Sequence, residues 1–166
     1  MLKFISPLIV VDDIERSRQF YEQLLGQRVK FDFGQNVAFE GEFSIHHKPH
    51  FQSLLGDTDK FPVARKANWG ELYFEMDDLE QPYQRLNEAG VEFIHPVLEQ
   101  PWGQRVMRLY DPDGHIVEIG ESMEAVIWRF YQQDLSIEAI SQKSSMPREF
   151  VEAVIKERTL GQTGSG

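Results

Sequence analysis

One carboxylate of this sequence occupies a position where a charge is costly. Glu118 lies in the middle of the strand-like run HIVEIG, with Ile116 and Gly120 on its own face and Val117 and Ile119 on the opposite one. Burying even a neutral polar group without a partner costs about 2–7 kcal/mol, and an unpaired charge costs more. We therefore expect Glu118 to be solvated in a cleft, paired with a base or bound to a cation, which makes it the candidate catalytic residue.

A hairpin positions this carboxylate. Residues 104–110 alternate as a strand does, and the turn Asp111–Gly114 (DPDG) follows them. Pro112 presets φ at the second turn position and Gly114 tolerates a positive φ, so the turn signal is strong. His115 comes directly after the turn, where we expect it to be exposed and without a role.

The hairpin closes the second of two copies of one pattern. Residues 8–31 and residues 73–93 each contain an apolar strand that ends in an acidic pair, an amphipathic helix, a glycine and a second strand. Two more strand-like runs follow each copy, so the sequence predicts a βαβββ module twice. The expected fold is α+β: one domain over residues 1–122, with modules at about 1–50 and 69–122 and a connection at 51–68.

A small helical appendage is predicted after the second module. Residues 123–158 form three amphipathic stretches, and residues 159–166 have the composition of a flexible tail. The last two stretches have the shape of a helix-turn-helix, but basic and acidic side chains balance in residues 147–158. Because DNA binding needs a basic face, we expect these helices to pack against the domain or a partner subunit instead.

Composition argues against several classes of function. The formal net charge is −10, whereas nucleic-acid binding depends on clustered lysine and arginine. The chain has no cysteine, which removes disulfides, thiolate metal sites and cysteine nucleophiles together. It also has no apolar run long enough for a membrane span. We expect a cytoplasmic protein that binds neither nucleic acid nor membrane.

The segments VDDIERSRQFYEQLLG, MDDLEQPYQRLNEAGVEF and DPDGHIVEIGE resemble the vicinal oxygen chelate superfamily, which includes glyoxalase I, bleomycin-resistance proteins and extradiol dioxygenases. The resemblance covers both modules in order. It implies that each module curls its strands into an open mixed sheet, that two modules enclose a cavity, and that the protein is a homodimer. It also implies one divalent metal ion, held by His and Glu from the first and last strands of each module.

Carried over position by position, the resemblance supports part of that metal site. Glu118 matches the family ligand of the last strand, and Glu71 stands where histidine is usual. Ser6 and Ile45 occupy the other two positions, where serine is a poor ligand and isoleucine cannot coordinate a metal. His47 lies two residues beyond Ile45 and so on its face, and a one-residue slip of register would instead turn His46 inward.

Glu71, Glu118 and one of these histidines would suit Mn²⁺, Ni²⁺, Fe²⁺ or Zn²⁺. Two interpretations without metal remain open: HHKPH is a solvated strand end, and Glu71 and Glu75, which share one face of their strand, are acids of the cavity wall solvated by trapped water. Arg105 and Arg108 fall on opposite faces of their strand, so at most one of them points into the cavity. The remaining candidates for contact with a small-molecule substrate are Ser6, Ile45, Tyr73, Trp102 (as a lid or a packing residue) and Arg105.

Two functions follow from the resemblance. The first is a metal-dependent isomerase or lyase, or a dioxygenase-like enzyme, in which Glu118 is a metal ligand or a base. The second is a binding protein of the resistance type, which holds a small molecule in the cavity between the modules without chemistry or metal. Because Ser6 and Ile45 replace two ligands, we do not expect orthodox glutathione-dependent glyoxalase I activity.

Overall fold

The computed structural model of the chain describes residues 2–56 and 62–163. The first module begins with β1 (Leu8–Val11) and α1 (Ile14–Arg18), and α1 continues as one π-helical segment, η1 (Gln19–Leu24). Its other strands are β2 (Val29–Asp32), β3 (Asn36–Phe39) and β4 (Ser44–His47).

The second module repeats this order of elements. It contains β5 (Glu71–Met76), α3 (Glu80–Glu88), β6 (Phe93–Glu99), β7 (Arg105–Tyr110) and β8 (Ile116–Glu121). A short helix, α2 (Lys48–Leu55), precedes it, and three helices follow it: α4 (Met123–Tyr131), α5 (Ile137–Ser144) and α6 (Arg148–Thr163).

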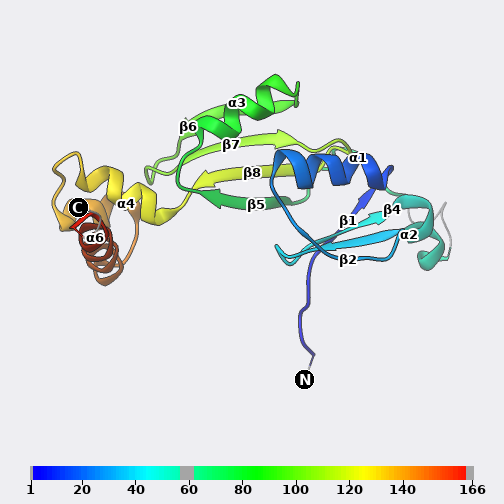
Figure 1. The fold of residues 1–166 in the computed structure, drawn as a ribbon, viewed down its shortest axis with the longest axis horizontal. Coiled ribbons are helices and arrows are strands. Elements are labelled where there is room, and N and C mark those ends of the chain that lie inside the picture. The colour runs from blue at the N-terminus through cyan, green and yellow to red at the C-terminus, as the bar shows by residue number, and fades with distance from the viewer. Residues whose placement is uncertain (1, 57–61, 164–166) are drawn as a thin grey trace. The chain divides into compact units, whose positions relative to one another are not determined.

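The two four-stranded sheets have the same topology. Their strand orders are β1-β4-β3-β2 and β5-β8-β7-β6, so each sheet places its first strand beside its last (Figure 1). In the first sheet β1 pairs with β4 in parallel, while β3 pairs antiparallel with both β2 and β4. The predicted α+β fold, with a duplicated βαβββ module and a C-terminal helical appendage, is confirmed.

The chain also divides into two compact units that do not coincide with the modules. One unit contains Met1–Leu72, Arg85–Glu92 and Leu109–Val117, and the other contains Tyr73–Gln84, Phe93–Arg108 and Glu118–Gly166. Strands β5, β7 and β8 therefore each contribute residues to both units.

Local signals in the sequence fix the ends of the helices. Asp13 Oδ1 accepts a hydrogen bond from the backbone N–H of Arg16 (3.0 Å) at the start of α1. Gly26 and Gly90 end the two equivalent helices with φ of 65° and 69°. Because a side chain disfavours this left-handed conformation, glycine at the same place in both modules is a physical trace of the duplication.

The DPDG turn is anchored to the first helix of the chain. Tyr21 donates its hydroxyl hydrogen to Asp111 Oδ2 (2.8 Å), and Asp113 accepts from Ser17 Oγ (3.0 Å) and from Arg16 Nη2 (2.8 Å). Burial, with the neighbouring Asp111 carboxylate, raises the pKa of Tyr21 well above its usual value. The two aspartates of the turn therefore hold the fold together and are not free for chemistry.

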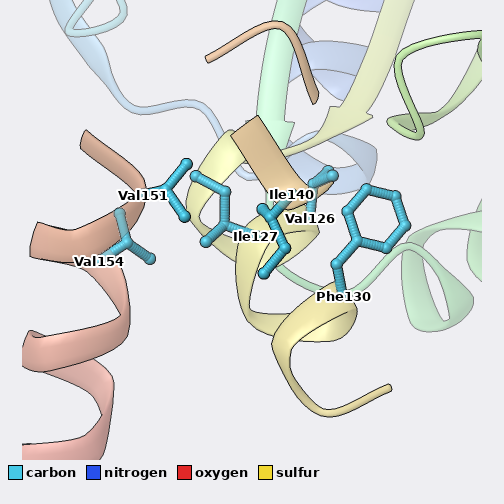
Figure 2. Close-up of a cluster of buried hydrophobic side chains, with 6 residues drawn as sticks. All are labelled: Val126, Ile127, Phe130, Ile140, Val151 and Val154. Carbon is cyan, nitrogen blue, oxygen red and sulfur yellow. The ribbon is translucent and has the colours of Figure 1, made fainter. Parts of the chain in front are cut away.

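The C-terminal helices pack around a hydrophobic core of their own. Six buried side chains form it (Figure 2): Val126, Ile127, Phe130, Ile140, Val151 and Val154. Ser122 caps α4, because its Oγ accepts from the backbone N–H of Ala125 (3.1 Å), as expected for a residue placed before an apolar stripe. The predicted appendage is thus a packed three-helix unit.

Two features differ from the prediction. The connection contains α2, which begins in HHKPH with a proline in its first turn, so His50 lies on a helix. Helix α6 continues to Thr163, beyond its expected end near residue 158, and residues 164–166 lie outside the described part of the chain. Over the described residues, no helix is both long and apolar enough to cross a membrane.

Candidate functional site

The second sheet has one face packed on a helix and one polar face. Phe93 contacts Tyr83 of α3 (ring centroids 5.3 Å apart), which identifies the helix side. On the other side, a Cβ added at Gly120 would lie 3.2–3.3 Å from the Tyr73 ring and hydroxyl and 3.0 Å from Gln104 Nε2. We call this second surface the polar face, and its residues are Tyr73, Glu75, Gln104, Arg108, Glu118 and Gly120.

Glu118 is the buried charge of the polar face. Its side chain is 9% exposed, and Oε2 forms an ion pair with the guanidinium of Arg108, whose side chain is 30% exposed. Arg108 Nη1 also lies 3.4 Å from Nε2 of His95 on the neighbouring strand. Of the three fates expected for Glu118, the structure supports pairing with a base, since a buried carboxylate beside a guanidinium is neutralised by it.

A chain of hydrogen bonds crosses the polar face beside this pair. Trp102 Nε1 donates to Gln104 Oε1 (3.0 Å), Gln104 Nε2 donates to the Tyr73 hydroxyl (2.7 Å), and that hydroxyl donates to Glu75 Oε1 (2.7 Å). Burial and the bond to the Glu75 carboxylate raise the pKa of Tyr73 to about 12, so its phenol stays a donor at neutral pH. Both aromatic rings are therefore held in place although each remains partly exposed, Tyr73 at 46% and Trp102 at 39%.

In the first sheet the structure selects the alternative register for β4. Ile45 is buried and pairs with Val37, so the two side chains share one face of the sheet. Phe39 lies on the same face as Val37, and its ring contacts that of Tyr21 in η1 (centroids 5.7 Å apart). Ile45 and, two residues on, His47 therefore face the helix, and their expected place on the concave face is wrong. His46 is the histidine of this strand that faces away from the helix.

The physical reason lies in the turns. Phe39 N–H bonds to Phe43 O as Asp111 N–H bonds to His115 O, so the two hairpins have equal length. His46 is therefore the structural equivalent of Glu118. Aligning Gly41 with Gly114 had instead matched Ile45 to Glu118, which is an error of one residue. In the first hairpin Glu42 takes the positive φ (59°) that Gly114 takes in the second. Gly41 and Gly114 therefore occupy different positions in their turns, and aligning them gave the wrong register for β4.

His46 is held by its neighbours. Its ring is stacked on that of His50 (centroids 4.9 Å apart), with His46 Nε2 2.7 Å from His50 Nδ1, so one nitrogen is the donor and the other the acceptor. Burial lowers the pKa of His46, and the neighbouring imidazoles add to the effect. The pair therefore favours a neutral His46.

The other predicted residues are dispersed. Ser6 precedes β1, which begins at Leu8, and Glu71 is an exposed residue at the start of β5. The Arg105 guanidinium lies 3.9 Å from Glu121 Oε1 on the helix side of the second sheet, so Arg108 is the arginine of the polar face. As predicted, the two arginines lie on opposite faces of β7, and Arg108 rather than Arg105 shares the face of Glu118.

The carboxylates and imidazoles of these two sheets do not form a set of ligands for a divalent cation. Glu118 is ion-paired with Arg108 and His46 is bonded to His50. Within residues 2–56 and 62–163, no three His, Asp or Glu side chains are grouped so that they could hold a metal ion. The arrangement instead suits recognition of an organic molecule, because it combines partly exposed aromatic rings with carboxylate acceptors.

Sequence reasoning missed Gln104 and His95 as residues of this site, and it gave Glu75 as an acid of the cavity wall. Alternation along 104–110 does place Gln104 and Arg108 on the face of Glu118 once the pairing of β7 with β8 is known. His95 carries no such signal, because strand β6 contains Pro96 and its hydrogen bonds to β7 change register between Glu92 and Gln100.

Comparison with known proteins places the chain among proteins with this duplicated module. Residues 4–124 match the family described as "Glyoxalase-like domain". A search of curated proteins found none that matches the chain. Among solved structures, a protein of unknown function from Agrobacterium tumefaciens str. C58 is similar, with 39% identity and a TM-score of 0.65, over 74% of this chain and 95% of that one.

Two more distant structures share the fold. A glyoxalase/bleomycin resistance protein/dioxygenase from Nocardioides has 21% identity and a TM-score of 0.58, over 73% of this chain and 84% of its own. A lactoylglutathione lyase from Agrobacterium tumefaciens has 23% identity and a TM-score of 0.54, over 74% and 96%. With its two βαβββ modules and the match over residues 4–124, the chain belongs to the glyoxalase-like domain family of the vicinal oxygen chelate superfamily.

Proposed function

We propose that this protein binds an organic small molecule at the polar face, without a divalent metal ion and without chemistry, as a binding protein of the resistance type. The observation that carries the proposal is the ion pair between Glu118 and Arg108. A carboxylate that a guanidinium already neutralises needs no cation, and a metal ion at Glu118 would have to displace Arg108 against like-charge repulsion.

The polar face also suggests the chemistry of the ligand. The rings of Tyr73 and Trp102 are partly exposed and are held by hydrogen bonds, so they can take a flat molecule with little loss of side-chain entropy. Glu75 ends the hydrogen-bond chain with a carboxylate, which accepts from an ammonium or an N–H group. We therefore expect a planar organic amine to bind better than a neutral or anionic molecule of the same size.

The first experiment measures metal. The protein is purified without chelator, incubated with Mn²⁺, Ni²⁺, Zn²⁺ or Fe²⁺, desalted and analysed for bound metal, in parallel with Glu118→Gln. Glu121→Gln is the matched control, because Glu121 is equally buried in β8 but pairs with Arg129 on the helix side. We expect far less than one metal ion per chain in all three proteins. Near-stoichiometric metal that is lost only in Glu118→Gln would refute the proposal in favour of the metal-dependent enzyme.

The second experiment measures binding. Titration with 9-aminoacridine, followed by its own fluorescence, should show saturable binding that weakens about tenfold in Glu75→Gln, because a charge-assisted hydrogen bond is lost. Glu138→Gln, an exposed change in α5, should not alter the affinity. Equal affinity in wild type and Glu75→Gln would contradict the proposed ligand chemistry. With the methylglyoxal–glutathione hemithioacetal we expect little or no glyoxalase activity.

The state of assembly belongs to the same proposal. The family resemblance favours a homodimer, and several large apolar side chains of the modules are exposed in the single chain: Phe31, Phe33, Trp69 and Tyr73. Large exposed apolar surface is typical of a partner-binding region. Light scattering after size-exclusion chromatography should give twice the chain mass of 19.4 kDa, and a monomer at micromolar concentration would contradict this expectation.

A further inference from the structure

A pocket lies on the helix side of the second sheet, opposite the polar face. It has a volume of about 550 Å³ and is lined by residues of α3, β6, α4 and α6 and by the side chains of Arg105 and Glu121. The family match ends at residue 124, whereas α4 begins at Met123. The walls contributed by α4 and α6 therefore belong to the appendage and not to the glyoxalase-like domain.

Helix α4 is shaped to serve as such a wall. Ala125, Trp128, Arg129 and Gln132 follow one another at helical spacing and all line the pocket. The opposite stripe of Val126, Ile127 and Phe130 is buried in the core of the three-helix unit (Figure 2). Because that core fixes α4 from behind, Trp128 and its neighbours are held in place before any ligand binds.

The charges of the pocket are mostly satisfied in pairs. Arg129 donates to both oxygens of the buried Glu121 (2.7 and 3.2 Å) and to Gly103 O (2.6 Å). At the rim, Arg158 donates to Asp77 Oδ2 (2.6 Å). Of the three arginines that line the pocket, Arg129 and Arg158 are therefore paired with carboxylates of the protein.

Arg105 differs from these two arginines. Its side chain is 47% exposed, and its guanidinium lies 3.9 Å from Glu121 Oε1, which is longer than a hydrogen bond. Glu121 is also already neutralised by Arg129, so little of its charge is left for Arg105. The pocket therefore contains a guanidinium group that is available to a ligand, together with two aromatic side chains, Tyr83 and Trp128.

We propose that this pocket binds a small organic monocarboxylate with an aromatic body. Its carboxylate would pair with the Arg105 guanidinium, and its ring would pack against Trp128 and Tyr83. The volume is in the range of small-molecule sites. Asp78 and Glu80 also line the pocket, so a second negative charge on the ligand meets repulsion, and dianions such as phosphonates bind less well.

The test uses the full chain with phenylacetate and indole-3-acetate as probes, followed by ligand-observed NMR titration. Both should bind saturably, and Arg105→Gln should weaken them about tenfold or more, because the charge-assisted bonds are lost. Trp128→Leu should weaken indole-3-acetate too. The matched control is Arg148→Gln, an exposed arginine of α6 that pairs with Glu152 (2.8 Å), and it should leave binding unchanged.

Either of two results would overturn the inference: no saturable binding of either probe up to about 10 mM, or equal affinity in wild type and Arg105→Gln. Tighter binding of benzylphosphonate than of phenylacetate would refute the assigned selectivity. Thermal unfolding of each variant separates loss of the ligand contact from loss of the fold. The result is independent of the polar-face proposal, since Arg105 and Trp128 take no part in that site.

Discussion

Replacing Arg108 with methionine would leave the Glu118 carboxylate buried beside an apolar side chain. The carboxylate is 9% exposed, and removing one partner of a buried ion pair typically costs about 3–5 kcal/mol. Because the Arg108 side chain is itself 30% exposed and the pair is partly solvated, we expect the lower end, about 3 kcal/mol. Glu118→Gln should cost only about 1 kcal/mol, since a guanidinium can reach water while a neutral amide remains inside.

The double variant distinguishes pairing from simple loss of packing. If the two side chains neutralise each other, Arg108→Met with Glu118→Gln should be less destabilised than the two single changes together, with a coupling energy of about 2 kcal/mol. Equilibrium unfolding in urea measures all four proteins, and the slope of the transition should stay constant. Arg148→Met, which breaks an exposed pair with Glu152, is the control and should change stability by less than about 0.5 kcal/mol.

The reasoning would be refuted if the double variant lost as much stability as the two single variants together. If Arg108→Met costs less than about 1 kcal/mol, the buried carboxylate is stabilised by something other than this guanidinium. The main argument for a metal-free site would then be lost as well.

Three further predictions concern the fold around the sites. Burial lowers the pKa of His46, so the unfolded chain binds a proton before the folded chain does as the pH falls. Stability should therefore decrease as the pH falls through the ordinary histidine pKa of about 6.5, and His46→Gln should flatten that slope in pH-dependent urea titrations. Asp113→Asn removes a buried charge that pairs with Arg16 and should cost about 2 kcal/mol by the same assay. Gly103→Ala would place a Cβ 2.2 Å from Phe130 at a φ of +85°, and calorimetry should show a loss of about 2 kcal/mol or more.

The repeated pattern of the sequence was sufficient to predict the fold. An acidic pair before each helix and a glycine after it are local signals, and the structure uses Asp13, Gly26 and Gly90 as expected. Ser122 before an apolar stripe likewise predicted the start of α4. Features of this kind depend on a few neighbouring residues, so a single sequence reveals them.

The site was less accessible because it depends on pairing between strands. Period-2 alternation gives two faces but does not say which one a helix will cover, and a one-residue error exchanged His46 with Ile45 and His47. The partner of Glu118 is ten residues away along the chain, and only the antiparallel turn at DPDG brings Arg108 beside it. The hydrogen bond between Trp102 and Gln104 is set by side-chain rotamers, which no periodicity encodes.

The hydrogen bonds that anchor the DPDG turn make the first repeat depend on the second. Ser17 and Tyr21, near the start of the chain, donate to the buried carboxylates of Asp113 and Asp111, which lie 96 and 90 residues later. A fragment that ends before β5 contains a whole βαβββ repeat but lacks both carboxylates, so these hydroxyl groups would have to bond to water or remain buried without acceptors. The first repeat therefore takes acceptors for two of its buried hydroxyl groups from the second, and we expect that it does not fold stably alone.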